Sequence, residues 1–289
     1  MNYSDDNNES NFIFEFWDLL LNYKYSILMT VITTTLIGLF YAVSAEPLYR
    51  AQVLMTESDN QTSGGGMGAI AEQIGGIAGL DIGGQGKSVD TYLAILKSRS
   101  FIENFIQESD SKKFIFANSW NNESGEWIEE EPSDFKAYYA FQEHILSVSK
   151  NVKTGVLTLS IVWHDPVRAA DWANNLVKNL NNILRIQAID EATKRITFLE
   201  EQTKKTSLIG LQSLISALIQ SQYEKAMIAN VKEEYGFKII DPARIPEVKF
   251  SPNRTLILIL SFVSGIFIGI LLALFMNIMA HYKRYKAST

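Results

Sequence analysis

The stretch LILILSFVSGIFIGILLALFMNIMA, residues 256–280, decides the fold because it carries no charged side chain over 25 positions. About 20 apolar residues in an α-helix cross the hydrocarbon core of a bilayer, so this stretch predicts a transmembrane helix. Lys283, Arg284 and Lys286 follow at once. A basic flank of this kind favours the cytoplasmic side, which predicts a cytoplasmic C-terminal tail.

A second charge-free run, residues 26–45, predicts another transmembrane helix near the other end of the chain. A cleaved signal peptide is the alternative for this run, but its length, the acidic residues before it and Pro47 just after it favour an uncleaved anchor. Two spans place both termini on one side and the domain between them in the periplasm. We therefore predict these segments: a cytoplasmic tail with an interfacial helix (1–25), the first span (26–45), a periplasmic domain (46–255), the second span (256–280) and a basic cytoplasmic tail (281–289).

Small residues recur every four positions on both predicted spans, which makes a flat stripe on each helix. Such stripes let helix backbones approach closely in lipid, where packing drives association. We expect them to form a contact, either within one chain or between neighbouring chains. The residues are Thr34, Gly38 and Ala42 on the first span, and Ser261, Gly265, Gly269 and Ala273 on the second.

Three prolines mark the approach to the second span, in DPARIPEVKFSPN, residues 241–253. Pro242, Pro246 and Pro252 cannot continue a helix interior or a central strand. They predict a stiff extended connector close to the membrane.

The segment between the spans alternates between strand and helix patterns. Period-two alternation predicts strands at 48–56, 146–150, 155–163 and 236–241. Asp165 followed by Pro166 predicts the start of a long helical region, 166–234, with a bend or reversal between Thr203 and Gly210. Shorter helices are expected at 88–107 and 133–144, with irregular chain at 108–132. The fold class is α+β: two transmembrane helices flank an α/β base domain that carries a long extended helix or helical hairpin.

Composition excludes several classes of site. The chain has no cysteine, so it has neither a disulfide nor a thiolate metal site, and its formal charge of −6 comes without the dense basic patch of a nucleic-acid-binding protein. Gly86-Lys87-Ser88 resembles the end of a phosphate-binding loop, but that motif needs a glycine where Asp81 stands. No catalytic or metal-ligating constellation is apparent. We expect no enzymatic activity, no cofactor and no metal.

Trp120 and Trp127 lie among Asn, Gly and Glu in the segment expected to be irregular. Aromatic side chains near polar groups suit sugar binding, and they also commonly cover the edge of a core. The second interpretation is the more common case.

The order of parts resembles the Wzz-type chain-length determinants, the kinase-less polysaccharide co-polymerases of bacterial inner membranes. Four stretches carry the resemblance: residues 49–51 (YRA); the glycine-rich tract leading into 93–99 (LAILKSR); 153–160 (KTGVLTLS) with Asp165-Pro166 and 172–174 (WAN); and 235–254, where IDPA precedes two further prolines.

The resemblance implies a ring-forming homo-oligomer that sets the modal length of a surface polysaccharide made by a Wzy-type polymerase. Lipopolysaccharide O-antigen is the first expectation for the polymer, with capsule or exopolysaccharide next. The partners implied are other copies of the chain, the polymerase, the growing polysaccharide and membrane lipid. Two alternatives stay open: a membrane adaptor for polysaccharide export or for a separate tyrosine kinase, and a two-span periplasmic sensor.

Overall fold

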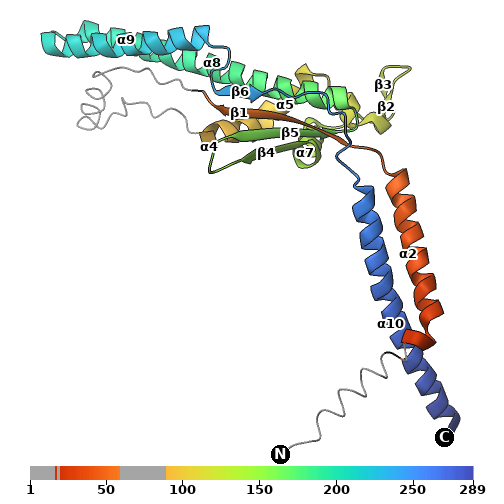
Figure 1. Ribbon diagram of the computed structural model, residues 1–289. Coiled ribbons are helices and arrows are strands. Elements are labelled where there is room, and N and C mark those ends of the chain that lie inside the picture. Colours follow the sequence, from red (N-terminus) through yellow and green to blue (C-terminus); the bar gives the residue numbers. More distant parts are fainter. Residues whose placement is uncertain (1–16, 18–19, 59–88, 289) are drawn as a thin grey trace, which may run out of the picture. The chain divides into compact units, whose positions relative to one another are not determined.

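The computed structural model describes residues 17, 20–58 and 89–288, which fall into two compact units (Figure 1). One unit spans residues 49–248 and contains the sheet and most of the helices. The other contains the two long apolar helices and the short segments next to them. The α+β fold class expected from the sequence is confirmed.

The sheet of the larger unit has four antiparallel strands in the order β4-β5-β1-β6. Strand β1 pairs with β5 along its length, and a bulge between Leu54 and Met55 shifts its register with β6. The neighbours β4 and β5 form the hairpin expected from the sequence, closed by Asn151 to Val156. The strands are β1 (Tyr49–Glu57), β4 (Leu146–Lys150), β5 (Leu157–Trp163) and β6 (Phe237–Asp241).

Alternate side chains of the two central strands point into a single hydrophobic core, as strand geometry requires. Val53 and Met55 on β1, and Leu157 and Leu159 on β5, are fully buried. The helices that cover this face all contribute to the same cluster. On the opposite face Gln52 donates to Ser160 Oγ at 3.1 Å, so that face is polar. The covering helices are α4 (Val89–Lys97), α5 (Arg99–Glu108), α7 (Asp134–Ala140) and the first half of α8 (Pro166–Lys205).

Helix α8 starts where the sequence predicts. The Asp165 carboxylate accepts hydrogen bonds from the amides of Val167 and Arg168, at 2.9 and 3.3 Å, and Pro166 occupies the first helical position. The same carboxylate also pairs with the Arg168 side chain. These contacts fix the direction in which the 40-residue helix leaves the sheet.

Two asparagines on α8 hold the edge strand β6 and the chain that follows it. Asn181 is 3% exposed; its Oδ1 accepts from the amides of Gly236 and Phe237, and its Nδ2 donates to Phe237 O. Two turns earlier, Asn174 makes both hydrogen bonds of Ala243, at 2.9 and 3.0 Å. The two side-chain amides therefore satisfy backbone groups at the start of β6 and just beyond its end, where a neighbouring strand would otherwise pair.

The prediction of a single helix at 88–107 is wrong, because the helix is interrupted at Ser98. Ser98 has extended backbone geometry, and its hydroxyl accepts from Phe101 N as the N-cap of α5. The hydroxyl also donates to Ile95 O, so it ends α4 as well as beginning α5. One serine thus replaces a continuous helix by two.

Two further expectations need correction. Helix α7 ends at Ala140 and continues as a π-helical turn, η2 (Phe141–Ile145), which leads directly into β4. Residues 108–132 are not irregular: they contain α6 (Lys112–Ile115), η1 (Ala117–Ser119) and a small hairpin of β2 (Trp120–Asn121) with β3 (Glu126–Trp127). The sequence did not predict that the two tryptophans pair across strands, because this segment has too few apolar residues to show an alternating strand pattern.

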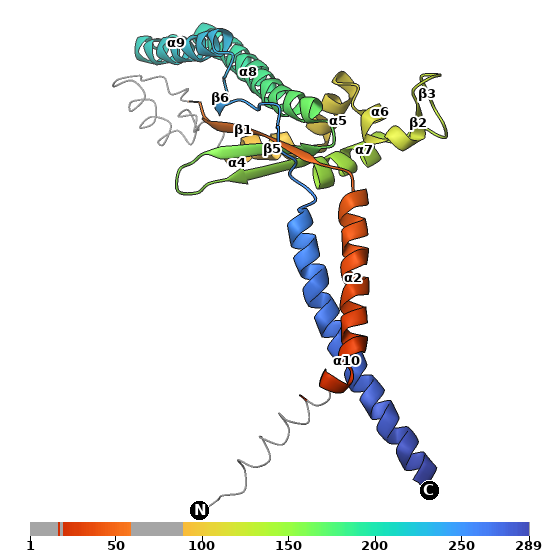
Figure 2. The same ribbon diagram turned by 45° about the vertical axis from the view of Figure 1, so that its right-hand side comes forward.

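The long helical region is a hairpin of two helices, α8 and α9 (Ile209–Val231). The reversal falls at residues 206–208, inside the window expected from the sequence. Helix α9 packs along the second half of α8, with Ala192, Ile196, Ile215 and Ala229 buried between them. In Figures 1 and 2 the closed end of this hairpin and the β2–β3 hairpin lie at opposite ends of the unit.

The smaller unit pairs α2 (Lys24–Ser44) antiparallel with α10 (Arg254–Ser288). Both have the length and composition of membrane-spanning helices, over Lys24–Ser44 and Arg254–Ala280, with mean hydropathies of 1.9 and 2.8. Only 11% and 17% of these windows is buried, which is far less than in the core helix of a soluble domain. The interfacial helix expected before residue 25 falls largely outside the described residues, and so does Gly86-Lys87-Ser88.

Candidate assembly sites

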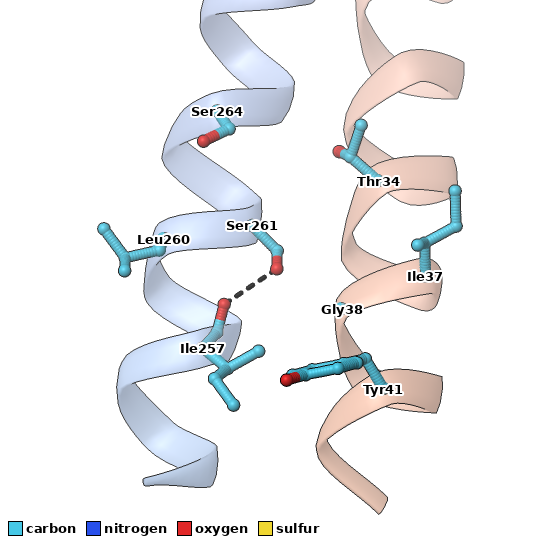
Figure 3. Close-up of a pocket in the computed structure, with 8 residues that line it drawn as sticks. All are labelled: Thr34, Ile37, Gly38, Tyr41, Ile257, Leu260, Ser261 and Ser264. Atoms are coloured by element: carbon cyan, nitrogen blue, oxygen red, sulfur yellow. Dashed lines mark hydrogen bonds between the residues drawn. The ribbon is translucent and has the colours of Figure 1, made fainter. Parts of the chain in front are cut away.

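The two apolar helices meet along the small residues singled out in the sequence. Gly38 of α2 faces Ser261 of α10 so closely that a methyl group on Gly38 would overlap the serine side chain (Figure 3). On the opposing helix, a Cβ at Gly265 would overlap the Thr34 hydroxyl and lie 2.9 Å from Val31 Cα. These two close approaches therefore each pair a glycine on one helix with a hydroxyl side chain on the other.

The same contact continues toward both ends of the pair. A Cβ at Gly269 would lie 3.2 Å from Ile27 Cα, while Ala42 and Ala273 are fully buried. Arg254 Nε donates to Ala42 O at 3.1 Å and so satisfies a carbonyl at the end of α2. The structure thus places all seven of the small residues named above along the line where α2 and α10 meet.

The hydroxyls in this contact are satisfied by their own helices. Ser261 Oγ donates to Ile257 O at 2.7 Å, drawn as a dashed line in Figure 3, and Thr34 Oγ1 lies 3.0 Å from the carbonyls of both Thr30 and Val31. Back-bonding of this kind leaves no hydroxyl unpaired in an apolar medium. The contact therefore rests on close packing of backbones.

An open groove of about 470 Å³ follows one side of this contact. Figure 3 shows Tyr41 reaching from α2 toward α10, where Ile257 and Ser261 face α2. Its lining is apolar apart from hydroxyl groups, which suits acyl chains or another helix.

The predicted proline connector divides between the two units. Pro242 and Pro246 lie in non-regular chain after β6, where Asn174 binds the backbone of Ala243. Pro252 lies in the smaller unit, next to a bridge in which Leu48 N donates to Ser251 O at 2.9 Å. Hydrogen bonds therefore hold the chain on both sides of residues 244–249.

Helix α9 presents an exposed, uncharged surface in a stretch whose apolar spacing is visible in the sequence. Residues 207–223 carry no charged side chain. Leu208 and Ile209 at the turn are 70% and 81% exposed, and Leu211 and Leu214 follow on the helix. Exposed apolar residues that lie together in this way are typical of an interaction surface. The sequence did not show which side of α9 remains uncovered.

A charged cluster fixes the loop before α7. Lys112 Nζ lies 2.6 Å from Glu131 Oε1 and 2.9 Å from Asp134 Oδ1. Burial disfavours the charged ammonium, but the hydrogen bonds to the two carboxylates outweigh it and raise the pKa of Lys112. The hydrogen bond from Lys112 in turn lowers the pKa of Asp134. The cluster lines a cleft of about 580 Å³.

Among the described residues, no group of three or more His, Asp or Glu side chains gathers as a metal site would require. His164 stacks on Trp163, with ring centroids 3.9 Å apart. The indole Nε1 of Trp163 is buried without a hydrogen-bond partner. Neither residue lies in a group of described side chains that resembles a catalytic or metal-binding site.

Comparison with known families bears on the first part of the chain. Residues 12–109 match the model of the Wzz family, described as chain length determinant protein. Residues 12–109 are therefore similar to the Wzz family. This match confirms the resemblance drawn from the sequence, and it covers the helix α2, the strand β1 and the helices α4 and α5. The description of the family names chain-length determination as its function.

Solved structures similar to this chain include a full-length bacterial polysaccharide co-polymerase, at 16% identity and a TM-score of 0.39. The match covers 92% of this chain and 97% of that one. A fragment of WzzB from Salmonella Typhimurium matches at 15% identity and a TM-score of 0.30, covering 71% and 100%. The Shigella flexneri O-antigen chain-length regulator matches at 13% identity and a TM-score of 0.21, covering 70% and 99%. These TM-scores are too low to support any further argument. A search of curated proteins gave no significant match.

Proposed function

We propose that this chain is a non-enzymatic, oligomeric membrane scaffold that regulates the chain length of a surface polysaccharide. The observation that carries the proposal is the match of residues 12–109 to the chain length determinant family, since the matched region includes both a candidate span and part of the base domain. The polymer we propose first is lipopolysaccharide O-antigen assembled by a Wzy-type polymerase; capsule or exopolysaccharide comes next.

The proposed location is the bacterial inner membrane, with both termini in the cytoplasm and residues 46–255 in the periplasm. The two apolar helices and the basic residues after the second support this topology. It brings the sheet and the helical hairpin to the side where a surface polymer is assembled.

Assembly into a ring of identical copies is supported by the surface of α9. Its uncharged residues 207–223 expose large apolar side chains. A neighbouring copy would cover such side chains, and copies related head to tail by a closing rotation form a ring. At the start of the edge strand β6, Asn181 already binds the backbone of Phe237. We propose that the ring joins through α9.

In the proposed mechanism, a ring of periplasmic domains holds the polymerase or the growing polysaccharide so that extension ends within a range of lengths. The close packing of α2 on α10 and the prolines after β6 would fix how each base sits on the membrane. Length preference would then come from the geometry of the whole ring.

Deleting the coding sequence in the producing cell and separating its surface polysaccharide on a gel tests the proposal. We expect the modal length distribution to be lost and to return when the full chain is supplied from a plasmid. An unchanged distribution after deletion would overturn the proposed function.

A further inference from the structure

The β2–β3 hairpin is a small, well-defined element. Trp120 pairs with Trp127 across its two strands, and the ring centroids lie 4.9 Å apart at 74°. Asn121 Oδ1 accepts from the amides of Glu123 and Ser124, which closes the turn. Gly125 completes the turn at a φ of +69°, a conformation that favours glycine.

The two tryptophans do not serve the core. Both are only half-buried, and neither is among the side chains packed against the hydrophobic cluster of the described residues. The chain before the hairpin does reach that cluster, through Phe114, Ile115 and Phe116. The expectation that these tryptophans cover a core edge is therefore wrong. The core holds the base of the hairpin and leaves the indole pair outside.

The charge around the pair restricts what can bind it. Residues 114–135 contain six carboxylates and no Lys, Arg or His. The cations next to this range are paired with carboxylates: Lys112 with Glu131 and Asp134, and Lys113 with Asp110. Arg168 and Arg99, which lie over the rings of Phe114 and Phe135, are paired with Asp165 and Glu103. A polyanion, whether a nucleic acid, an acidic polysaccharide or an anionic membrane surface, would be repelled. An uncharged ligand rich in hydroxyl groups would not.

We propose that the Trp120–Trp127 hairpin binds a neutral segment of polysaccharide. The face of an indole carries negative potential and attracts the weakly positive C–H groups of a pyranose ring. Carboxylates close to Trp127 in the sequence, such as Glu126 and Glu129, can accept hydrogen bonds from sugar hydroxyls, and charged acceptors make the stronger bonds. Neither indole N–H makes a hydrogen bond within the described residues, so both remain able to donate to a sugar oxygen.

This inference rests on the proposed function, because it names the part of the polymer-handling surface that contacts glycan. A purely structural role is the alternative: an edge-to-face indole pair also stabilises an isolated two-stranded hairpin, which is marginal by itself. The two roles separate if ligand binding and hairpin geometry are measured independently.

The test uses the full chain in detergent and two probes: dextran as a neutral polysaccharide and alginate as a polyanionic one. Binding is followed by saturation-transfer NMR and titration calorimetry for the wild type, Trp120→Phe, Trp127→Phe, Trp120→Leu and Trp127→Leu. The matched control is Tyr139→Leu, which removes an exposed aromatic side chain of α7 instead. Hairpin geometry is followed by the backbone chemical shifts of residues 121–126, which can be compared between proteins with and without the indole pair.

We expect dextran to bind and alginate not to bind. Each Trp→Leu variant should weaken dextran binding by at least about fivefold, the low end of the loss when one aromatic stacking surface is removed. Each Trp→Phe variant should retain most of it, and the backbone chemical shifts of residues 121–126 should be unchanged in all four variants. Tyr139→Leu should bind as the wild type does.

Three results would overturn the inference: no binding of dextran, equal binding of alginate, or Trp→Leu variants that bind dextran as well as the wild type. Each is distinguishable from failure of the proposed function. If dextran does not bind, gene deletion can still change the polymer length. If deletion does not change the polymer length, the purified chain can still bind dextran.

Discussion

Asn181 on α8 makes two hydrogen bonds to the backbone of Phe237 on β6: its Oδ1 accepts from Phe237 N at 2.7 Å and its Nδ2 donates to Phe237 O at 2.8 Å. Because Phe237 is fully buried, water cannot replace these bonds. The relationship ties the strand that leaves the base domain to the first half of the long helix. It also satisfies the backbone N–H and C=O of Phe237 at the start of β6.

Replacing Asn181 with alanine should destabilise the chain by about 2–3 kcal/mol, because buried amide and carbonyl groups of residues 236 and 237 lose their partners. Chemical unfolding of the full chain in detergent measures the change. Asn182→Ala is the matched control, since Asn182 is exposed and should change stability by less than about 0.5 kcal/mol. Equal effects of the two substitutions would show that the amide does not hold β6.

Replacing Gly265 with leucine should separate α2 from α10, because there is no space for a side chain beside Thr34 and Val31. Ile266→Leu, one position along on an exposed part of the helix, is the control that keeps composition and hydrophobicity. The readout is resistance of the helix pair to unfolding by harsh detergent. Wild-type resistance in Gly265→Leu would mean that the helices do not pack through this glycine.

A disulfide tests the same contact without disrupting it. The chain contains no cysteine, so Thr34→Cys with Gly265→Cys introduces a single possible pair. A Cβ at position 265 would lie 3.5 Å from Thr34 Cβ, within the range that disulfides adopt. We expect oxidation to close a bond within one chain, seen as a shift in gel mobility at monomer mass. Covalent dimers in place of that band would indicate that these stripes join different chains.

Acid should weaken the anchoring of the loop at residues 131–134. Since the pKa of Asp134 is lowered in the folded state, its contribution is present above its ordinary pKa near 3.8 and is lost as pH falls through the folded value. The contribution is modest, below about 1 kcal/mol, because the carboxylate is half exposed. Asp134→Asn should therefore lose stability near neutral pH and show a shallower acid dependence, whereas Glu123→Gln should match the wild type. Identical acid profiles for all three proteins would remove this role of the Lys112 cluster.

Placing charge at the start of α9 should disperse the proposed oligomer. Leu208→Glu with Ile209→Glu puts two carboxylates on the most exposed apolar part of the hairpin turn, away from the core. Val152→Glu is the control, because Val152 is an equally exposed apolar residue in the β4–β5 turn. Mass measurement of the detergent complexes should give a multi-subunit wild type and control and a smaller Leu208/Ile209 variant. A monomeric wild type would count directly against the ring.

Local patterns in the sequence predicted much of this fold, because they depend on neighbouring residues. Alternation indicated the strand β5, and Asp165-Pro166 marked the start of α8 to the residue. The spacing of Gly265 and Gly269 identified the face that packs on α2. In each case the signal lies within a few residues of the element it describes.

What the sequence could not show depends on contacts between distant residues. The order β4-β5-β1-β6 joins strands separated by more than 100 residues. Asn181 resembles any other polar residue on a half-buried helix until its partner, 56 positions later, is known. Ser98 was missed for a different reason: the apolar spacing continues across it, and only the local geometry shows that its hydroxyl both ends one helix and begins the next.

The most direct test of the central claim is the length distribution of the surface polysaccharide in cells that lack the chain and are complemented with defined variants. The account predicts that deletion abolishes the modal length, that the wild type and Val152→Glu restore it, and that the dispersed Leu208→Glu, Ile209→Glu variant does not. A modal length that persists without the chain would contradict the account.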